Sequence, residues 1–213
     1  MAKQKINDDK VIVGITHGDY NGIAYEVIMK TLQDQRCLEF FTPIIYGSAK
    51  VCSYYRKALN IKDFSFNPLR YPNQLQHNKN NLINIYEKEI RIDYGKSTES
   101  AGELAFLALE KATEGLKNGD IDVLVTAPIN KENIQSDHFH FPGHTEYLAN
   151  KFNSEDYLML MVGKTMRLGV ITGHIPLKDV PEVLTKELIL KKINILHESL
   201  VKDFGISKPK IAL

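Results

Sequence analysis

The sequence lacks the features that mark secreted and membrane proteins. Its two cysteines, Cys37 and Cys52, lie fifteen positions apart and form no C-x-x-C pair, so we expect no disulfide framework and a reducing compartment. The polar start "MAKQKINDDK" has no apolar core of a signal peptide behind it. The longest strongly apolar run, "YLMLMVG", is too short to span a bilayer. We therefore expect a cytoplasmic protein with no membrane partner.

An excess of charge of one sign is also missing. The chain of 213 residues has 27 Lys and Arg against 26 Asp and Glu, a net charge of +1, and contains no basic run or stripe. Nucleic acid and anionic membrane surfaces are therefore not expected as partners. A small molecule or a second copy of the chain fits better. No internal repeat or low-complexity tract is present.

Strand-like and helix-like segments alternate along the chain, which predicts an α/β fold with a mainly parallel sheet and flanking helices. The strand-like segments are "VIVGI" (11–15), "FFTPIIYG" (40–47), "IDVLVTAP" (121–128) and the two halves of "YLMLMVGKTMRLGVIT" (157–172). The helix-like segments are "IAYEVIMKTL" (23–32), "SAKVCSYYRKAL" (48–59), the stretch from Ser100 to "NGD" at 118–120, and the stretch marked by Ile189, Ile193, Leu196 and Leu200. We expect a first lobe at 1–128 and the start of a second at 129–213.

Four details of this prediction depend on local chemistry. Ser48 is placed to cap the helix that follows it, and Ser100 and Glu103 have capping-box spacing. The uniformly apolar segment 121–128 is typical of a strand buried on both faces of a sheet. "KPKIAL" at the C-terminus resembles the opening of another strand, which leaves the sheet unfinished.

Ligand sites in open α/β sheets lie beyond the carboxyl ends of the strands. Three segments occupy such positions: "THGDYNG", "TAPINK" and "TGHIPL". The glycines of the first are spaced by four, which matches neither the dinucleotide fingerprint nor a phosphate-binding Walker loop. This segment is either a ligand loop or a tight turn between strand and helix. Lys131, in the second, is a candidate for phosphate binding or acid–base work, although exposed lysines are commoner.

Three histidines crowd into "HFHFPGHTEYL", at 138, 140 and 144. His144 and Thr145 stand where a helix is expected to begin, a place suited to an anion because of its N–H groups and helix dipole. Alternatively, Thr145 is only an N-cap and His144 only a loop histidine. His138 and His140 alternate with phenylalanines, so in an extended segment they would share an exposed face. A zinc site there would need a third ligand.

His174 in "VITGHIPL" follows a strand end and precedes Pro176. A neutral imidazole on a stiff loop is a good metal ligand, but one histidine does not make a site.

Four segments together resemble, in order and spacing, the 4-hydroxythreonine-4-phosphate dehydrogenase family of vitamin B6 biosynthesis. They are "THGDYNGIAYEV", "TAPINKENI", "FPGHTEYLA" and "RLGVITGHIPLKDV". The resemblance covers essentially the whole chain. It implies an isocitrate/isopropylmalate dehydrogenase-like fold, a homodimer, and NAD- or NADP-dependent oxidation of 4-phosphohydroxy-L-threonine. Decarboxylation then gives 3-amino-2-oxopropyl phosphate, a step in pyridoxine and pyridoxal phosphate biosynthesis.

Matched residue by residue, the resemblance assigns substrate contacts to His144 and Thr145 and a divalent-metal ligand (zinc, magnesium or cobalt) to His174. The family's first loop usually carries Pro and Glu where this chain has His17 and Asp19, so these two residues receive no role. Lys131 is likewise left without an assigned role. Catalytic residues stay unassigned.

The family continues past the position of Leu213, where it has two more metal histidines and much of its nucleotide site. We therefore expect the C-terminal part of the fold to be missing and the 213-residue chain alone to be inactive. Two alternatives stay open: a dehydrogenase of 4-phospho-threonate or 4-phospho-erythronate, and a truncated, non-catalytic dimerisation or binding module.

Overall fold

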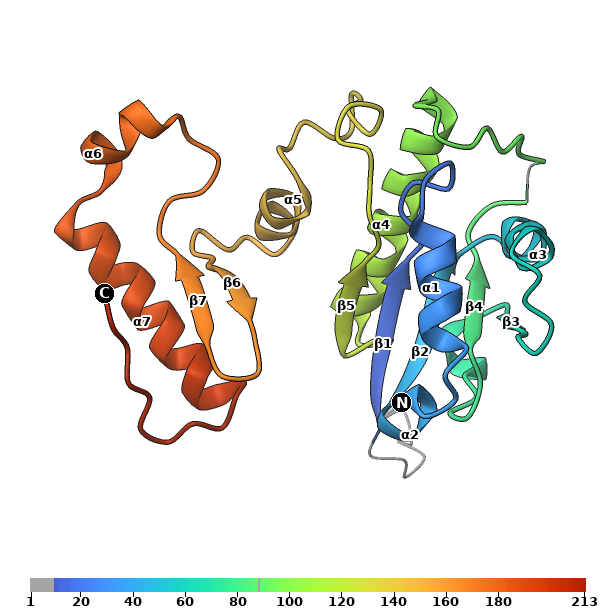
Figure 1. Cartoon of the computed structure of the whole chain (residues 1–213), viewed down its shortest axis with the longest axis horizontal. Coiled ribbons are helices and arrows are strands. Elements are labelled where there is room, and N and C mark those ends of the chain that lie inside the picture. The colour runs from blue at the N-terminus through green and yellow to red at the C-terminus, as the bar shows by residue number, and fades with distance from the viewer. Residues whose placement is uncertain (1–9, 88) are drawn as a thin grey trace. The chain divides into compact units, whose positions relative to one another are not determined.

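A computed structural model describes residues 10–87 and 89–213, which form two compact units (Figure 1). The described residues up to His140 make the first unit, and Phe141–Leu213 make the second. The boundary between the units thus follows residue 140, whereas the boundary expected from the sequence follows residue 128.

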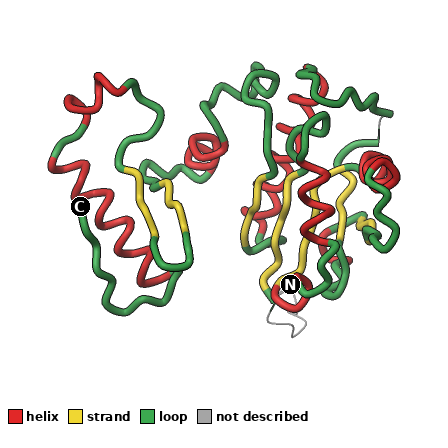
Figure 2. Tube along the Cα trace, viewed as in Figure 1, coloured by secondary structure: helices red, strands yellow, loops and turns green. Residues whose placement is uncertain are grey.

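The first unit contains a five-stranded sheet, whose strands are yellow in Figure 2, in the order β3-β4-β2-β1-β5. Every neighbouring pair of strands is parallel. The strands are β1 (Val11–Thr16), β2 (Phe41–Gly47), β3 (Asn67–Leu69), β4 (Asn81–Asn84) and β5 (Val123–Thr126). In the centre of the sheet, Ile15 of β1 lies beside Ile45 of β2 on one side and Val125 of β5 on the other. The predicted α/β fold with a mainly parallel sheet is confirmed.

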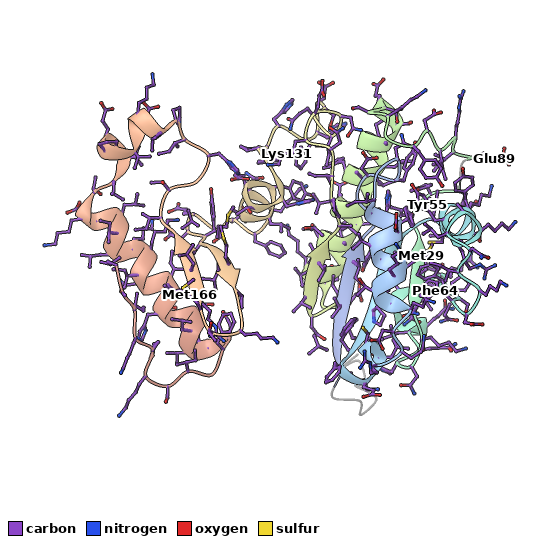
Figure 3. All side chains as sticks on the ribbon, in the orientation of Figure 1. Met29, Tyr55, Phe64, Glu89, Lys131 and Met166 are labelled. Atoms are coloured by element: carbon purple, nitrogen blue, oxygen red, sulfur yellow. The ribbon has the colours of Figure 1, made fainter. Side chains whose placement is uncertain are left out.

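Helices cover both faces of this sheet because successive side chains of a strand point to opposite faces. The helical elements are α1 (Ala24–Leu32), α2 (Cys37–Phe40), α3 (Ala49–Ala58), a 3-10 turn η1 (Pro72–Gln74) and α4 (Glu99–Asn118). On one face, Ile45 packs in a core with Met29 of α1 and Tyr55 of α3, both labelled in Figure 3. On the other face, Ile44 packs in a core with Ala112 of α4.

The capping predictions have different outcomes. The Ser48 side chain accepts a hydrogen bond from the Val51 N–H at 3.5 Å, as expected. The capping box at Ser100 is wrong, because α4 begins two residues earlier, where extended Thr98 accepts from the Ala101 N–H at 3.3 Å. The Ser100 hydroxyl instead shares a hydrogen bond of 2.9 Å with the Tyr20 hydroxyl. α4 ends as predicted, at Gly119 with a φ of 71°.

β5 is not buried on both faces, and that prediction is wrong. Val123 and Val125 are 45% and 49% exposed, because β5 is at the edge of the sheet and pairs only with β1 among the described strands. A run of apolar residues in the sequence does not distinguish a central strand from an edge strand.

The second unit combines an antiparallel hairpin with helices. Its elements are α5 (His144–Lys151), β6 (Met159–Val162), β7 (Arg167–Val170), a 3-10 turn η2 (Leu177–Asp179), α6 (Val180–Val183) and α7 (Lys186–Lys202). The predicted turn between the two strands is confirmed, and the Gly163 N–H donates to the Met166 carbonyl at 2.8 Å within it. "KPKIAL" is not a strand, because no described strand pairs with it. No described helix has the length and apolar character needed to cross a membrane.

Candidate functional site

Two of the expected ligand loops meet at the carboxyl edge of the first unit's sheet. The Asp19 N–H, after β1, donates to the Pro128 carbonyl, after β5, at 2.8 Å. Gly18 makes this approach possible: its φ is +64°, and a Cβ atom at this position would lie 2.3 Å from the same carbonyl oxygen. The segment "THGDYNG" is thus a tight strand-to-helix turn that packs on the neighbouring loop.

His17 is fully buried in this turn among aromatic rings. Its ring stacks on Tyr25 at 5.4 Å and meets Tyr86 edge-on at 5.8 Å between centroids. Neither ring nitrogen has a hydrogen-bond partner among the described residues. Burial lowers the pKa of His17 from 6.5 to about 4, and backbone groups of Leu104 and Gly18 only partly oppose this shift. The imidazole is therefore neutral at physiological pH.

The turn is also tied to the segment before α4. The Asn21 amide accepts from the Asp93 N–H at 2.9 Å and donates to the Thr98 hydroxyl at 2.9 Å. Asp19 accepts from the Asn21 N–H at 2.8 Å, while burial raises the pKa of its carboxyl group. Asn21 was not singled out from the sequence, because the partners of its side chain are more than 70 residues away.

Lys131 lies in the turn after β5, in the first unit, and its side chain is exposed (Figure 3). Asn130 shapes this turn by accepting from the Glu132 N–H at 2.9 Å. The turn packs closely on α4, since a Cβ atom on Gly102 would lie 1.7 Å from the Asn133 carbonyl oxygen. The backbone near Lys131 is therefore fixed, and the ammonium group is accessible.

In the second unit, α5 begins at His144, so the predicted loop-to-helix junction is confirmed. The N-cap is Gly143, which has no side chain, so the suggestion that Thr145 is the N-cap is wrong. Thr145 lies in the first turn of α5, where backbone N–H groups and the helix dipole favour an anion. His144 and Thr145 are both half-buried. Their contact with substrate stays a prediction.

His174 is exposed in the loop between β7 and η2. The described residues contain no group of three or more His, Cys, Asp or Glu side chains placed to hold a metal ion. A catalytic metal needs about three protein ligands, so His174 by itself does not make such a site. Its role as a metal ligand stays a prediction.

His138 and His140 are exposed and Phe139 between them is buried, as the alternation predicted. The segment is not extended, however, because Ser136 and Phe139 close a tight turn with two backbone hydrogen bonds. The ring of His138 also stacks on Phe106, with 6.4 Å between centroids.

Comparison with known proteins gives the family. Residues 39–213 match the family described as pyridoxal phosphate biosynthetic protein PdxA. A relative from Bacteroides thetaiotaomicron, named 4-hydroxythreonine-4-phosphate dehydrogenase, is 43% identical over 98% of this chain and 57% of its own length. A Sulfurihydrogenibium relative with the same name is 34% identical, over 95% of this chain and 62% of its own. The chain thus spans about three fifths of the length of these relatives.

Solved structures agree with this result. A 4-hydroxythreonine-4-phosphate dehydrogenase from Burkholderia phymatum superposes with a TM-score of 0.81 at 25% identity, over 95% of this chain and 62% of that one. The crystal structure of the Klebsiella pneumoniae enzyme gives 0.79 at 25% identity, over 96% and 62%. The chain belongs to the family of the pyridoxal phosphate biosynthetic protein PdxA.

Proposed function

We propose that the protein carrying this chain oxidises 4-phosphohydroxy-L-threonine with NAD or NADP, followed by decarboxylation to 3-amino-2-oxopropyl phosphate. The observation that carries the proposal is the 43% identity, over nearly the whole chain, to a relative named 4-hydroxythreonine-4-phosphate dehydrogenase. In this proposal the protein acts in pyridoxal phosphate biosynthesis, as a cytoplasmic homodimer.

The substrate carries negative charge, and the first turn of α5 suits an anion. Thr145 can donate a hydroxyl hydrogen bond to an anionic oxygen there, and His144 can donate from a ring nitrogen. Glu146 in the same turn carries a negative charge, so it favours a ligand that also has an ammonium group. These contacts would bind and orient the substrate.

His174 is proposed as one ligand of a divalent metal, zinc, magnesium or cobalt. When bound, such an ion lowers the pKa of a coordinated hydroxyl group and stabilises negative charge on oxygen. By the family resemblance, the remaining metal and nucleotide contacts correspond to positions after 213. We therefore propose that residues 1–213 alone have no dehydrogenase activity. In this respect they would behave as the alternative, a non-catalytic binding or dimerisation module, would.

A second substrate is supported by other relatives. Proteins from Oceanobacillus iheyensis and Clostridium botulinum, named putative D-threonate 4-phosphate dehydrogenase, are 32% and 31% identical to this chain. 4-Phospho-threonate, and similarly 4-phospho-erythronate, lacks the amino group of 4-phosphohydroxy-L-threonine. The higher identity to the relatives acting on the amino acid favours the first substrate.

The test is NAD(P)H formation with each of the three phosphorylated acids, using residues 1–213 joined to the C-terminal remainder of the Bacteroides relative. The proposal expects the highest kcat/KM with 4-phosphohydroxy-L-threonine. Preference for a sugar-acid phosphate would replace this substrate with the second one. No turnover with any of them, in a folded protein, would remove the dehydrogenase proposal.

A further inference from the structure

A polar cavity lies at the amino edge of the first unit's sheet, at the opposite end from the turn that holds His17. Its volume is about 500 Å³, within the range of small-molecule sites. The wall is built by the start of β3, the segment before β4, the end of α3 and the connection after α1. Phe64, labelled in Figure 3, is part of the wall and packs edge-on against Phe66 at 4.7 Å between centroids.

The lining of this cavity is positively charged. Arg56, Lys62 and Lys79 contribute three cations and Asp63 contributes one carboxylate, which leaves two positive charges. None of the four forms an ion pair with another described residue. The Arg56 Nη1 donates to the Phe64 carbonyl at 3.3 Å, and this bond uses only one of the five N–H donors of a guanidinium group.

The cavity lining also includes a buried amide side chain, that of Asn80. Asn80 lines the cavity and is only 4% exposed, and its Nδ2 donates to the Leu32 carbonyl at 3.3 Å. Its Oδ1 has no hydrogen-bond partner among the described residues. Buried polar atoms are almost always paired in native proteins. This oxygen is shielded from solvent, so a rotation of the Asn80 amide toward the cavity would let a hydroxyl or ammonium donor of a ligand supply the partner that it lacks.

From these observations we propose that the cavity binds a small phosphate monoester that also carries a hydroxyl or amino group. A phosphate monoester has a charge of about −1.5 to −2 at neutral pH, which matches the net charge of the lining. Arginine binds phosphate through paired N–H donors and lysine as a point charge. The phosphate lies between Arg56, Lys62 and Lys79, and the donor group of the ligand bonds to the Asn80 Oδ1.

Glycerol 3-phosphate is a suitable probe, because it carries a phosphate group and two hydroxyl groups. Its binding to the chain is measured by calorimetry at low salt, beside inorganic phosphate and glycerate. The proposal expects glycerol 3-phosphate to bind more tightly than either. Equal affinity for inorganic phosphate would refute the role of Asn80, equal affinity for glycerate would refute the preference for phosphate, and absence of binding would refute the site.

Lys62→Gln/Lys79→Gln is the informative variant, because both side chains are exposed and their loss leaves the core intact. Its affinity for glycerol 3-phosphate should fall by about tenfold or more, since two charge-assisted contacts are lost. Lys57→Gln/Lys96→Gln removes the same charge from exposed positions outside the cavity and should leave affinity nearly unchanged. An equal loss in both variants would mean attraction to overall charge and would overturn the proposal.

A measurement on the unmodified chain removes any dependence on the folding of variants. Lysines are acetylated with a small reagent, with and without glycerol 3-phosphate, and the modified sites are read by mass spectrometry. Lys62 and Lys79 should be protected by the ligand and Lys57 should not. Unchanged acetylation of Lys62 and Lys79 at saturating ligand would contradict the proposal.

Discussion

Gly18 and Pro128 join the turn after β1 to the loop after β5 at the carboxyl edge of the first unit's sheet. The backbone turns at Gly18 with a φ of +64°, and the next N–H, that of Asp19, donates to the Pro128 carbonyl at 2.8 Å. A side chain at position 18 would therefore meet both a conformation that L residues rarely adopt and a carbonyl oxygen 2.3 Å from its Cβ atom.

Gly18→Ala should destabilise the chain by roughly 2–6 kcal/mol, the sum of a left-handed backbone cost and a steric clash with backbone. Urea unfolding followed by circular dichroism measures the change. Gly22→Ala is the matched control, because its Cβ atom would make only ordinary contacts from 3.6 Å. Similar stability of the two variants would mean that the loop contact at Pro128 is not important.

His17 should make stability depend on pH. Its folded-state pKa is lowered to about 4 by burial, below the ordinary value of 6.5, so the unfolded chain binds more protons between these values. The contribution is fully present above pH 6.5 and is lost as the pH falls towards 4. A shift of this size corresponds to roughly 3 kcal/mol. The measurement is the free energy of unfolding at several pH values in this window.

His17→Phe keeps a ring among Tyr20, Tyr25 and Tyr86 and removes the titrating group, so it should flatten this dependence. The nearby Asp19 titrates in both proteins and largely cancels in the comparison. His140→Phe, at an exposed position, should keep the slope of the unmodified chain. A His17→Phe slope as steep as that of the His140→Phe variant would contradict the account.

Much of the first unit's fold could be predicted from the sequence, because hydrophobic runs and turn residues define its strands and helices locally. Neighbours in the sheet could not be predicted from local sequence. The uniformly apolar sequence of β5 therefore predicted buried valines, although these valines lie on an edge strand. Helix starts were predictable where a single capping side chain was present, as at Ser48. The start of α4 was not predictable, because both Thr98 and Ser100 are suitable N-cap residues.

For the candidate site, the sequence located His144 at the start of α5 because a loop with Pro and Gly precedes it. It could not show that His17 is enclosed by tyrosines, since Tyr86 comes from another part of the chain. The cavity lined by Asn80 could not be predicted from the sequence either, because its cationic residues are spread over 24 positions, from Arg56 to Lys79.

His144→Ala, in the chimera with the Bacteroides remainder, should raise the KM for 4-phosphohydroxy-L-threonine by about tenfold to a hundredfold through loss of a charge-assisted contact. Bound metal, measured by elemental analysis, should stay nearly unchanged, because His174 is the proposed ligand. Loss of metal with an unchanged KM would reverse the two assignments.

His138→Ala/His140→Ala should leave both metal content and KM unaltered, because the two side chains lie on an exposed turn. Phe139 is retained in this variant, so the buried part of the turn is preserved. Loss of stoichiometric metal here would mean that the metal site has been misplaced.

The most direct test of the central claim compares three polypeptides in one assay of NAD(P)H formation from 4-phosphohydroxy-L-threonine with zinc, magnesium or cobalt. They are residues 1–213 alone, the chimera, and the chimera with His174→Ala, each checked for cooperative unfolding. We predict turnover by the chimera only, with tight metal binding lost in the His174→Ala variant. Turnover by residues 1–213 alone, or an active His174→Ala chimera with its metal retained, would contradict the account.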